Sequence, residues 1–220
     1  MNEPVAQDPN EAFDVVTFDG KPTGIVKLRA EVHRDGDWHR SLHVWVAGVD
    51  NLGPFLTFQR RSLEKDTWGG KLDATVGGHF RAGETLAETL REVQEEIGVA
   101  AAREALTFLG VRVCVNDAES GVRDRELQSV FLWRDNRPLL HFAPDPVELA
   151  ELVRFRLADL LPFFADNMET LDGLARRPNA DRLDRVVVGH GDFIAQVDRY
   201  FYRIAIAADR AIRGEPDIAI

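Results

Sequence analysis

Four glutamates recur at helical spacing in one segment of this chain: Glu88, Glu92, Glu95 and Glu96. On a helix that turns by about 100° per residue, their side chains fall within an arc about 100° wide. A solvated surface is one explanation, but solvated faces usually mix lysine with glutamate, and this arc contains no lysine. Because Mg²⁺ is held by carboxylate oxygens together with substrate phosphates, the cluster predicts a divalent metal site.

The segment that carries these glutamates, residues 84–97, is predicted to be one continuous helix that ends at Gly98 in a C-cap position. Its apolar residues form a second arc that would face the core; they are Leu86, Leu90, Val93 and Ile97. Glycines upstream permit backbone angles that bring a carbonyl or an amide close to a ligand; they are Gly77, Gly78 and Gly83. The N-terminus of the helix adds a site that favours anions.

The composition is that of an ordinary globular chain. Of 220 residues, 45% are hydrophobic and 29% are charged, which allows one buried domain with an appended helical segment. The net charge of −10 argues against binding to nucleic acid, which requires cationic side chains. An anionic ligand would need metal ions or clustered arginines to reverse the local potential.

The sequence indicates neither a targeting segment nor the paired cysteines of disulfides and zinc sites. No stretch approaches the roughly 18 consecutive apolar residues of a membrane helix, and the N-terminus lacks the apolar region of a secretory signal. Cys114 is the only cysteine, which excludes internal disulfides and zinc sites built from paired cysteines. We expect a cytoplasmic protein that binds neither membranes nor nucleic acid.

Apolar periodicity and turn residues predict a sheet around the glutamate helix. Strands are expected at residues 13–18, 42–49, 54–60, 72–76, 106–115 and 126–133. Helical segments are expected at residues 27–33, 146–153, 157–164 and 193–213, the last capped by Asp192.

Residues 77–99 resemble the Nudix box. That motif contains a glycine, a Gly-Glu pair and the run Arg-Glu-apolar-x-Glu-Glu-x-Gly-apolar, and residues 91–99 fit the run at every position. The chain departs from the motif in one respect, because six residues rather than seven separate Glu84 from Arg91. This departure bears on the role of Glu84 and leaves the carboxylate cluster intact.

Further segments resemble the branch of this superfamily nearest isopentenyl-diphosphate isomerase. They are residues 38–45, 59–62, 71–79 and 124–126, and the resemblance covers roughly residues 12–165. In the isomerase a catalytic cysteine directly precedes a Gly-His pair, and in this chain Gly77 occupies that position. Isomerase chemistry needs an acid on each side of an alkene, and one acid is missing. The chain therefore resembles a hydrolase relative of the isomerase.

The resemblance implies a role for each matching residue of the box. Glu92 and Glu96 would bind Mg²⁺ or Mn²⁺, and Glu95 would be either a further ligand or the catalytic base. The carbonyl of Gly77 would complete the metal shell. Arg91 would support catalysis by pairing with a carboxylate.

Residues outside the box are implied in the same way. Glu126 would supply a carboxylate from a separate strand, as metal ligand or base, with a plain surface glutamate as the alternative. For Asp124, a role in the site and no role stay equally open. Arg60 and Arg61 could bind phosphates of the substrate, although strand alternation allows only one of them to face the site.

The same resemblance gives some histidines a counterpart in the isomerase and others none. His43 and His79 match metal-ligand positions of the isomerase, but a structural role through hydrogen bonding is favoured for both. His33 and His39 have no counterpart at the right spacing. His190 is interpreted as a loop residue outside the resemblance.

Together with the resemblance, these observations predict an α/β fold, a Nudix-like α/β/α sandwich with a mixed β-sheet and a C-terminal helical extension. Residues 1–12 would be a polar tail, residues 13–165 the hydrolase domain, and residues 166–220 the extension, packed on the domain or forming a homodimer contact. The expected activity is metal-dependent hydrolysis of a phosphoanhydride in a small-molecule diphosphate linked to another group, a nucleoside among the possibilities. Isomerisation of an allylic diphosphate and a non-catalytic nucleotide-binding module remain as alternatives.

Overall fold

A computed structural model describes residues 10–65, 67–117, 121–195 and 197–220. The strands are β1 (Ala12–Val16), β2 (Pro22–Leu28), β3 (Trp38–Asp50), β4 (Gly53–Arg61), β5 (Leu72–Asp73), β6 (Val76–His79), β7 (Leu106–Asp117), β8 (Arg123–Arg134), β9 (Leu149–Arg156), β10 (Thr170–Arg176) and β11 (Asp184–Gly189). The α-helices are α1 (Arg29–Asp35), α2 (Leu86–Thr89), α3 (Arg91–Ile97), α4 (Leu157–Phe164) and α5 (Tyr200–Ile212).

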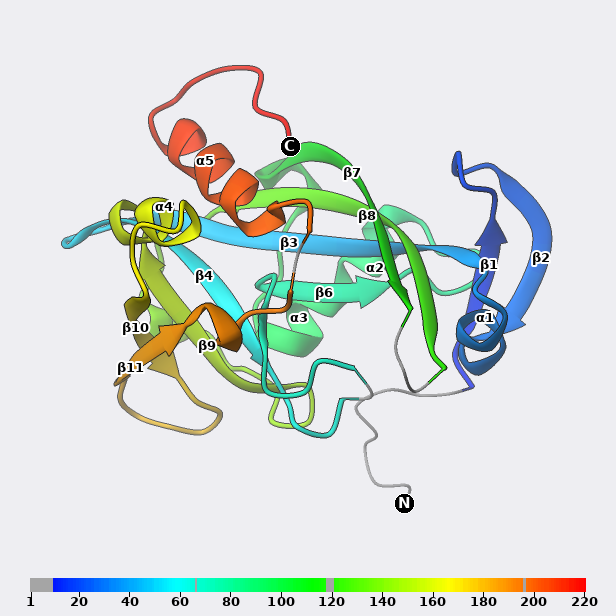
Figure 1. The fold of residues 1–220 in the computed structure, drawn as a ribbon, viewed down its shortest axis with the longest axis horizontal. Coiled ribbons are helices and arrows are strands. Elements are labelled where there is room, and N and C mark those ends of the chain that lie inside the picture. Colours follow the sequence, from blue (N-terminus) through cyan, green and yellow to red (C-terminus); the bar gives the residue numbers. More distant parts are fainter. Residues whose placement is uncertain (1–9, 66, 118–120, 196) are drawn as a thin grey trace.

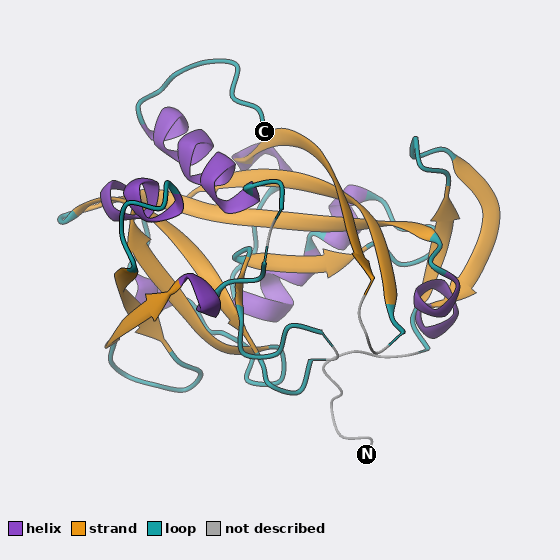
Figure 2. Cartoon of the chain, viewed as in Figure 1, coloured by secondary structure: helices purple, strands orange, loops and turns teal. Residues whose placement is uncertain are grey.

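These elements form one mixed sheet with helices on both faces (Figures 1 and 2). The main strand order is β11-β10-β9-β4-β3-β1-β2, with β5 on β4, β6 and β8 on β3, and β7 on β8. Strands β3 and β8 run parallel, and their neighbours pair antiparallel. The α/β/α sandwich expected from the sequence is confirmed.

Strand β3 lies between two hydrophobic clusters because its side chains alternate between the faces of the sheet. Trp45 and Ala47 belong to the cluster that includes residues of α4 and α5, whereas Leu42, Val44 and Val46 belong to the cluster that includes residues of α3. All five side chains are fully buried. The glutamate helix and the C-terminal helix therefore cover opposite faces of the same strand.

The single helix expected over residues 84–97 is corrected to two short helices, α2 and α3, which meet at Leu90. Helix α2 begins after Thr85, whose backbone N–H donates to the Glu88 carboxylate at 2.8 Å. At the junction, the N–H of Val93 bonds to the carbonyl of Leu90 three residues earlier, a tighter winding than that of an α-helix. The expected apolar arc is buried, and Gly98 ends α3 with φ 74° as expected.

Residues 146–153 were expected to be helical, but most of them form β9. This strand pairs with β4 on one side and β10 on the other, and both of its faces are largely buried. A strand buried on both faces lacks the polar–apolar alternation that identifies a strand in a sequence. Residues 27–33 were likewise expected to form only a helical turn, and they contain the end of β2 before α1.

The C-terminal segment, residues 166–220, is not wholly helical. Strands β10 and β11 extend the sheet, and the expected helix over residues 193–213 begins only at Tyr200. Asp192 accepts a hydrogen bond from the backbone N–H of Gly189 at 2.9 Å instead of capping α5. Tyr200 fixes α5 to β3, because its hydroxyl accepts a hydrogen bond from Trp45 Nε1 at 2.9 Å.

The expected polar tail is only partly within the described residues, because residues 1–9 lie outside them. Ala12 already begins β1, and the carbonyl of Glu11 accepts a hydrogen bond from the N–H of Arg29 at 2.6 Å. The end of the expected tail therefore belongs to the fold.

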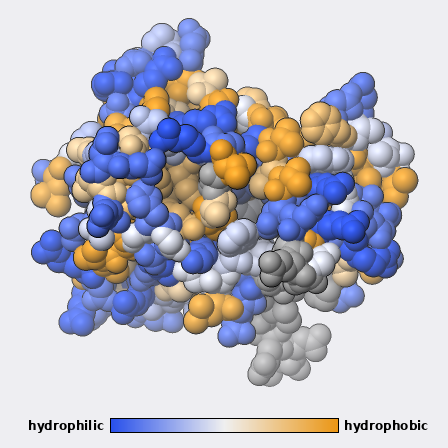
Figure 3. Space-filling model, viewed as in Figure 1, coloured by the Kyte–Doolittle hydropathy of each residue, from blue (hydrophilic) through white to orange (hydrophobic). Residues whose placement is uncertain are grey.

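The surface carries scattered hydrophobic groups. Figure 3 shows hydrophobic residues interspersed with hydrophilic ones over the face in view. On β7, Val111, Val113 and Val115 are 47% to 57% exposed. Within the described ranges, no helix has both the length and the apolar character needed to cross a membrane. A homodimer contact stays a prediction.

Candidate functional site

Two adjoining cavities open beside β6, with volumes of about 440 and 360 Å³. Both are lined by the same five residues: Arg29, Arg61, Gly77, Gly78 and His79. The first cavity is bordered by α3, and the second extends along β7 and β8 to the segment that precedes α5. Because the cavities share a wall, one ligand could extend through both.

Three glutamates of α3 line the first cavity: Glu92, Glu95 and Glu96. Glu96 is 3% exposed and accepts a hydrogen bond from the N–H of Gly77 at 3.3 Å. The side chain of Glu95 lies at the rim and is 53% exposed. Burial raises the pKa of Glu92 to about 7 and raises the pKa of Glu96 well above its usual range. These two carboxylates, one half-buried and one buried, resist ionisation, and a divalent cation between them would favour their ionised forms.

Arg91 lies among these carboxylates. Its Nη2 atom is 2.8 Å from Glu92 Oε1, and its Nη1 atom is 3.1 Å from Glu84 Oε1. The Nε atom is 3.8 Å from Glu95. This placement fits the expected supporting role, and Glu84 reaches Arg91 despite the shortened spacing of the box.

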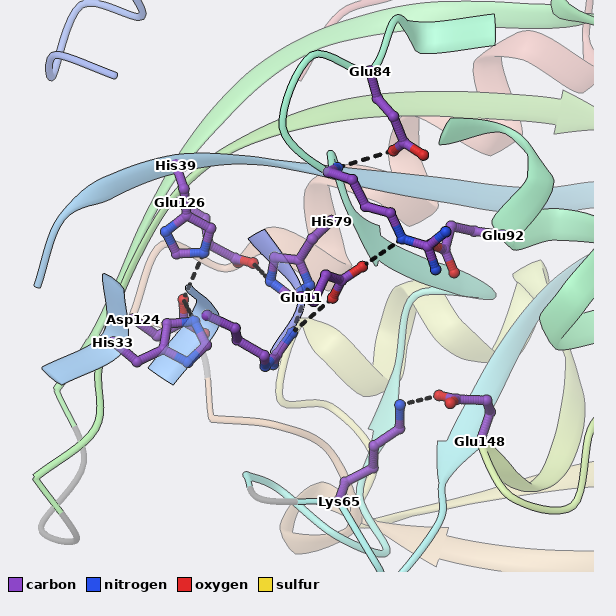
Figure 4. A network of polar contacts seen from close by, with 12 residues as sticks. Glu11, His33, His39, Lys65, His79, Glu84, Glu92, Asp124, Glu126 and Glu148 are labelled. Atoms are coloured by element: carbon purple, nitrogen blue, oxygen red, sulfur yellow. Dashed lines mark hydrogen bonds and ion pairs between the residues drawn. The ribbon is translucent and has the colours of Figure 1, made fainter. Parts of the chain in front are cut away.

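A second group of potential metal ligands lies beyond the shared wall (Figure 4). His33, His39, His79 and Asp124 come from α1, β3, β6 and β8, and each offers one ligand atom within 4.8 Å of the others. His33 and His39 had no role expected from the sequence, and a structural role was favoured for His79. The group was missed because four separate elements contribute to it.

Three polar atoms of this group lie close together without a hydrogen-bond partner. His39 Nδ1 is 3.1 Å from the carbonyl of Asp37, which can only accept, so Nδ1 carries the proton and Nε2 a lone pair. That Nε2 atom is 3.5 Å from Asp124 Oδ1, and His33 Nε2 is 3.7 Å from the same oxygen. All three atoms are buried without a hydrogen-bond partner. Burial and the neighbouring Glu126 raise the pKa of Asp124 well above its usual range. A divalent cation would favour the ionised carboxylate, and it could bind the lone pair of His39.

Glu126 lies with this second group and not with the glutamates of α3 (Figure 4). Its Oε1 atom is 2.9 Å from His79 Nε2. Arg29 donates to His79 Nδ1 at 3.2 Å, so the His79 proton is on Nε2 and faces Glu126. His79 would therefore have to release one of these two contacts before it could bind a cation. Burial opposes ionisation of Glu126, but the hydrogen bond with His79 lowers the pKa of the carboxyl well below its usual range. Burial lowers the pKa of His79 to about 3, which keeps the ring neutral.

The structure therefore divides the five residues that were expected to form one metal shell. The first cavity contains Gly77, Glu92, Glu95 and Glu96, and the second group contains Glu126. The sequence could not separate them because the box motif specifies only residues close to one helix.

The two arginines at the end of β4 diverge, as strand alternation predicts. Arg61 lines both cavities and is 3.8 Å from Asp73. Arg60 instead binds Glu151 at 2.8 Å and Asp192 at 3.2 Å. Arg60 lines neither of these two cavities, which favours Arg61 over Arg60 as the residue that contacts phosphates.

Lys65 is a cavity residue that sequence analysis did not single out. It lines the first cavity and forms an ion pair with Glu148 (Figure 4). Its positive charge counteracts the effect of burial on the pKa of Glu96. No motif in the surrounding loop identified it.

Comparisons with known proteins identify the family of this chain. A family model of the NUDIX domain matches residues 37–173. Nudix hydrolase 3 of Arabidopsis thaliana is 41% identical over 125 residues, which are 56% of this chain and 16% of that protein, so the chain spans only a small part of that relative. Isopentenyl-diphosphate Delta-isomerase of Brevibacterium linens is 32% identical over 142 residues, which are 64% of this chain and 74% of the isomerase.

A solved structure supports the fold. A MutT/nudix family protein from Enterococcus faecalis superposes with a TM-score of 0.51 and 14% identity, over 80% of this chain and 64% of that one. At this low identity, the likeness concerns the fold alone.

Proposed function

We propose that this chain, which belongs to the Nudix family, hydrolyses an acid anhydride in a phosphorus-containing compound. The substrate would be a diphosphate linked to a second group, and the cofactor would be Mg²⁺ or Mn²⁺. The observation that carries this proposal is the pair of carboxylates Glu92 and Glu96, the first 16% exposed and the second buried, which line a cavity that cationic side chains also line. A nucleoside is one candidate for the second group.

Cationic residues around the first cavity fit a diphosphate. They are Arg29, Arg61, Lys65 and Arg81, in a chain whose net charge is −10. Guanidinium groups can bind phosphate oxygens in pairs, and an ammonium group acts as a compact point charge. Five glutamates among the described residues line the same cavity, so these side chains would need a bound divalent ion as well to make the potential favourable for the substrate.

The acidic residues would have two different roles, metal binding and general-base catalysis. Glu92 and Glu96 would hold a divalent ion, with the carbonyl of Gly77 as a further ligand. When bound, such an ion polarises phosphoryl oxygens and lowers the pKa of its water. Glu95, at the accessible rim, is one candidate for the base, and Glu126, behind His79, is the other.

A panel of diphosphate compounds tests the proposal. The full chain is incubated with each compound in Mg²⁺, in Mn²⁺ and in EDTA, and release of phosphate or nucleotide is measured. We expect metal-dependent release from at least one compound, with turnover abolished in Glu96→Gln and retained in the surface variant Glu104→Gln. Unchanged activity in a folded Glu96→Gln variant would remove the carboxylates of α3 from the mechanism.

Isomerisation of an allylic diphosphate is a second candidate, supported by the similarity to isopentenyl-diphosphate Delta-isomerase. Gly77 at the position of the isomerase cysteine argues against it. Formation of the dimethylallyl isomer from isopentenyl diphosphate would support this alternative. The intact run of residues 91–99 argues against a non-catalytic module, and a panel without any turnover would favour one.

A further inference from the structure

Arg112 connects the segment before α5 to the second ligand group. Its Nε and Nη2 atoms bind the Asp198 carboxylate at 2.8 and 3.2 Å. Its Nη1 atom donates to Gln128 Oε1 at 2.8 Å, and Gln128 Nε2 donates to Glu126 Oε2 at 2.5 Å. The guanidinium carbon lies 4.1 Å from the centre of the Tyr200 ring. A continuous polar chain therefore leads from the start of α5 to Glu126.

Each bond of this chain has a fixed direction. A guanidinium can only donate, so Gln128 presents its oxygen to Arg112 and its NH₂ group to Glu126. Without Arg112, the amide could turn over and present its oxygen to the Glu126 carboxylate, a contact between two acceptors. Gln128 is 3% exposed and Glu126 is 8% exposed, so bulk water has little access to replace the lost contact.

The same residues border the second cavity, so this polar chain is part of the site. Arg112, Gln128 and Asp198 all line the cavity, together with Glu126. Glu126 is in turn 2.9 Å from His79, which belongs to the group of potential metal ligands. An outer residue that orients an acidic group at a metal site commonly affects metal affinity or activity by about 10–100-fold.

We propose that Arg112 is a positioning residue for Glu126: it is held by Asp198, acts through Gln128, and makes the segment before α5 part of the functional site. Asp198 lies beyond residues 37–173, which match the family model. The inference rests on the second ligand group binding a divalent ion, which the proposed function, with its ion at Glu92 and Glu96, does not require.

Mn²⁺ affinity tests this role independently of turnover. The affinity is measured by electron paramagnetic resonance in the Glu92→Gln/Glu96→Gln background, which removes the buried carboxylates of the first cavity. We expect Arg112→Lys and Asp198→Asn to weaken binding by about 10-fold. Asp209→Asn is the matched control, because Asp209 also lies in the C-terminal region but pairs with Arg213 at 2.9 Å.

Two results of the Mn²⁺ titration would overturn the proposal. Affinity within twofold of the parent in both folded variants would overturn the proposal, and so would the absence of Mn²⁺ binding in the parent. Circular dichroism and thermal unfolding establish that each variant is folded. Arg112→Lys retains the positive charge beside Asp198, so the variant keeps an ion pair there that supports folding.

A double-mutant cycle separates positioning from a general effect on α5. If Asp198 acts through Gln128, Asp198→Asn has no further effect on Mn²⁺ affinity once Gln128→Leu is present. Equal effects of Asp198→Asn with and without Gln128 would contradict the polar chain.

Hydrolysis assays keep the two proposals distinguishable. A parent chain that hydrolyses nothing in the panel, with Mn²⁺ affinity still weakened by Asp198→Asn, would refute the function and support the positioning role. Full hydrolysis with unchanged Mn²⁺ affinity would remove the positioning role alone.

Discussion

The backbone of Gly78 lies directly against the side chain of Glu92. A Cβ atom added to this glycine would be 2.5 Å from Glu92 Cγ and 2.8 Å from Glu92 Cδ. Arg91 binds the Glu92 carboxylate at 2.8 Å from the other direction. The side chain of Glu92 is therefore held between β6 and Arg91, and its position depends on the absence of a side chain at residue 78.

Gly78→Ala is expected to displace the Glu92 carboxylate and lower metal-dependent hydrolysis by about 10–100-fold. Steady-state rates at a series of Mn²⁺ concentrations measure the loss of turnover and of metal activation. Gly191→Ala is the control, because a Cβ atom there would meet no heavy atom within 4 Å. Equal rates for Gly78→Ala and the wild type would show that Glu92 need not occupy this position.

Substitution of the neighbouring Gly77 is expected to leave the stability of the fold unchanged. A Cβ atom at Gly77 would come no closer than 3.7 Å to Gln59 or His43, which is ordinary van der Waals contact. Gly77→Cys should therefore fold with a melting temperature close to that of the wild type, whereas Gly78→Cys should be destabilised. Thermal unfolding in metal-free buffer compares the two variants. Marked destabilisation of Gly77→Cys would mean that a cysteine does not fit the backbone at this position.

The two arginines of β4 should differ in kinetics. Arg61→Ala is expected to raise KM about 10-fold or more, because a charged hydrogen bond to phosphate contributes about 1.5–3 kcal/mol. Arg60→Ala should leave KM unchanged and lower the free energy of unfolding by about 1–3 kcal/mol, because Glu151 loses its 2.8 Å partner. Steady-state kinetics and urea unfolding measure the two effects. An equal rise of KM in both variants would place Arg60 in the site after all.

Glu92 should make the stability of the metal-free chain depend on pH. Burial raises its folded pKa from 4.5 to about 7, so its unfavourable ionisation destabilises the folded state as pH rises through this interval. Glu92→Gln should therefore match the wild type near pH 4.5 and be more stable at pH 8, by up to about 3 kcal/mol. Urea unfolding of both proteins in EDTA at the two pH values measures this difference. A difference that does not change with pH would contradict the burial of Glu92.

The box could be predicted from the sequence because its chemistry follows the periodicity of a local segment. The second ligand group could not, because it depends on strand register. The parallel β3–β8 pair sets His39 opposite Glu126, and the β3–β6 pair sets Ser41 opposite His79. These pairings join residues more than 30 positions apart, and no local pattern specifies them. The apolar run of β9 was mistaken for a helix for a related reason, since burial on both faces removes its alternation.

In the C-terminal segment too, the sequence predicted a local element but not its long-range contacts. The apolar spacing of residues 201, 204 and 208 correctly indicated a helix, and these residues are buried. The sequence did not indicate that Asp198, just before α5, would meet Arg112 on β7. That contact follows from the packing of α5 on the sheet, which brings together residues 86 positions apart.

Anomalous diffraction from a crystal of the full chain grown with Mn²⁺ tests the central claim most directly. We predict an anomalous peak within coordination distance of Glu92 and Glu96, and its loss in Glu96→Gln. The account would be contradicted by carboxylates of α3 that extend into solvent, with no peak beside them.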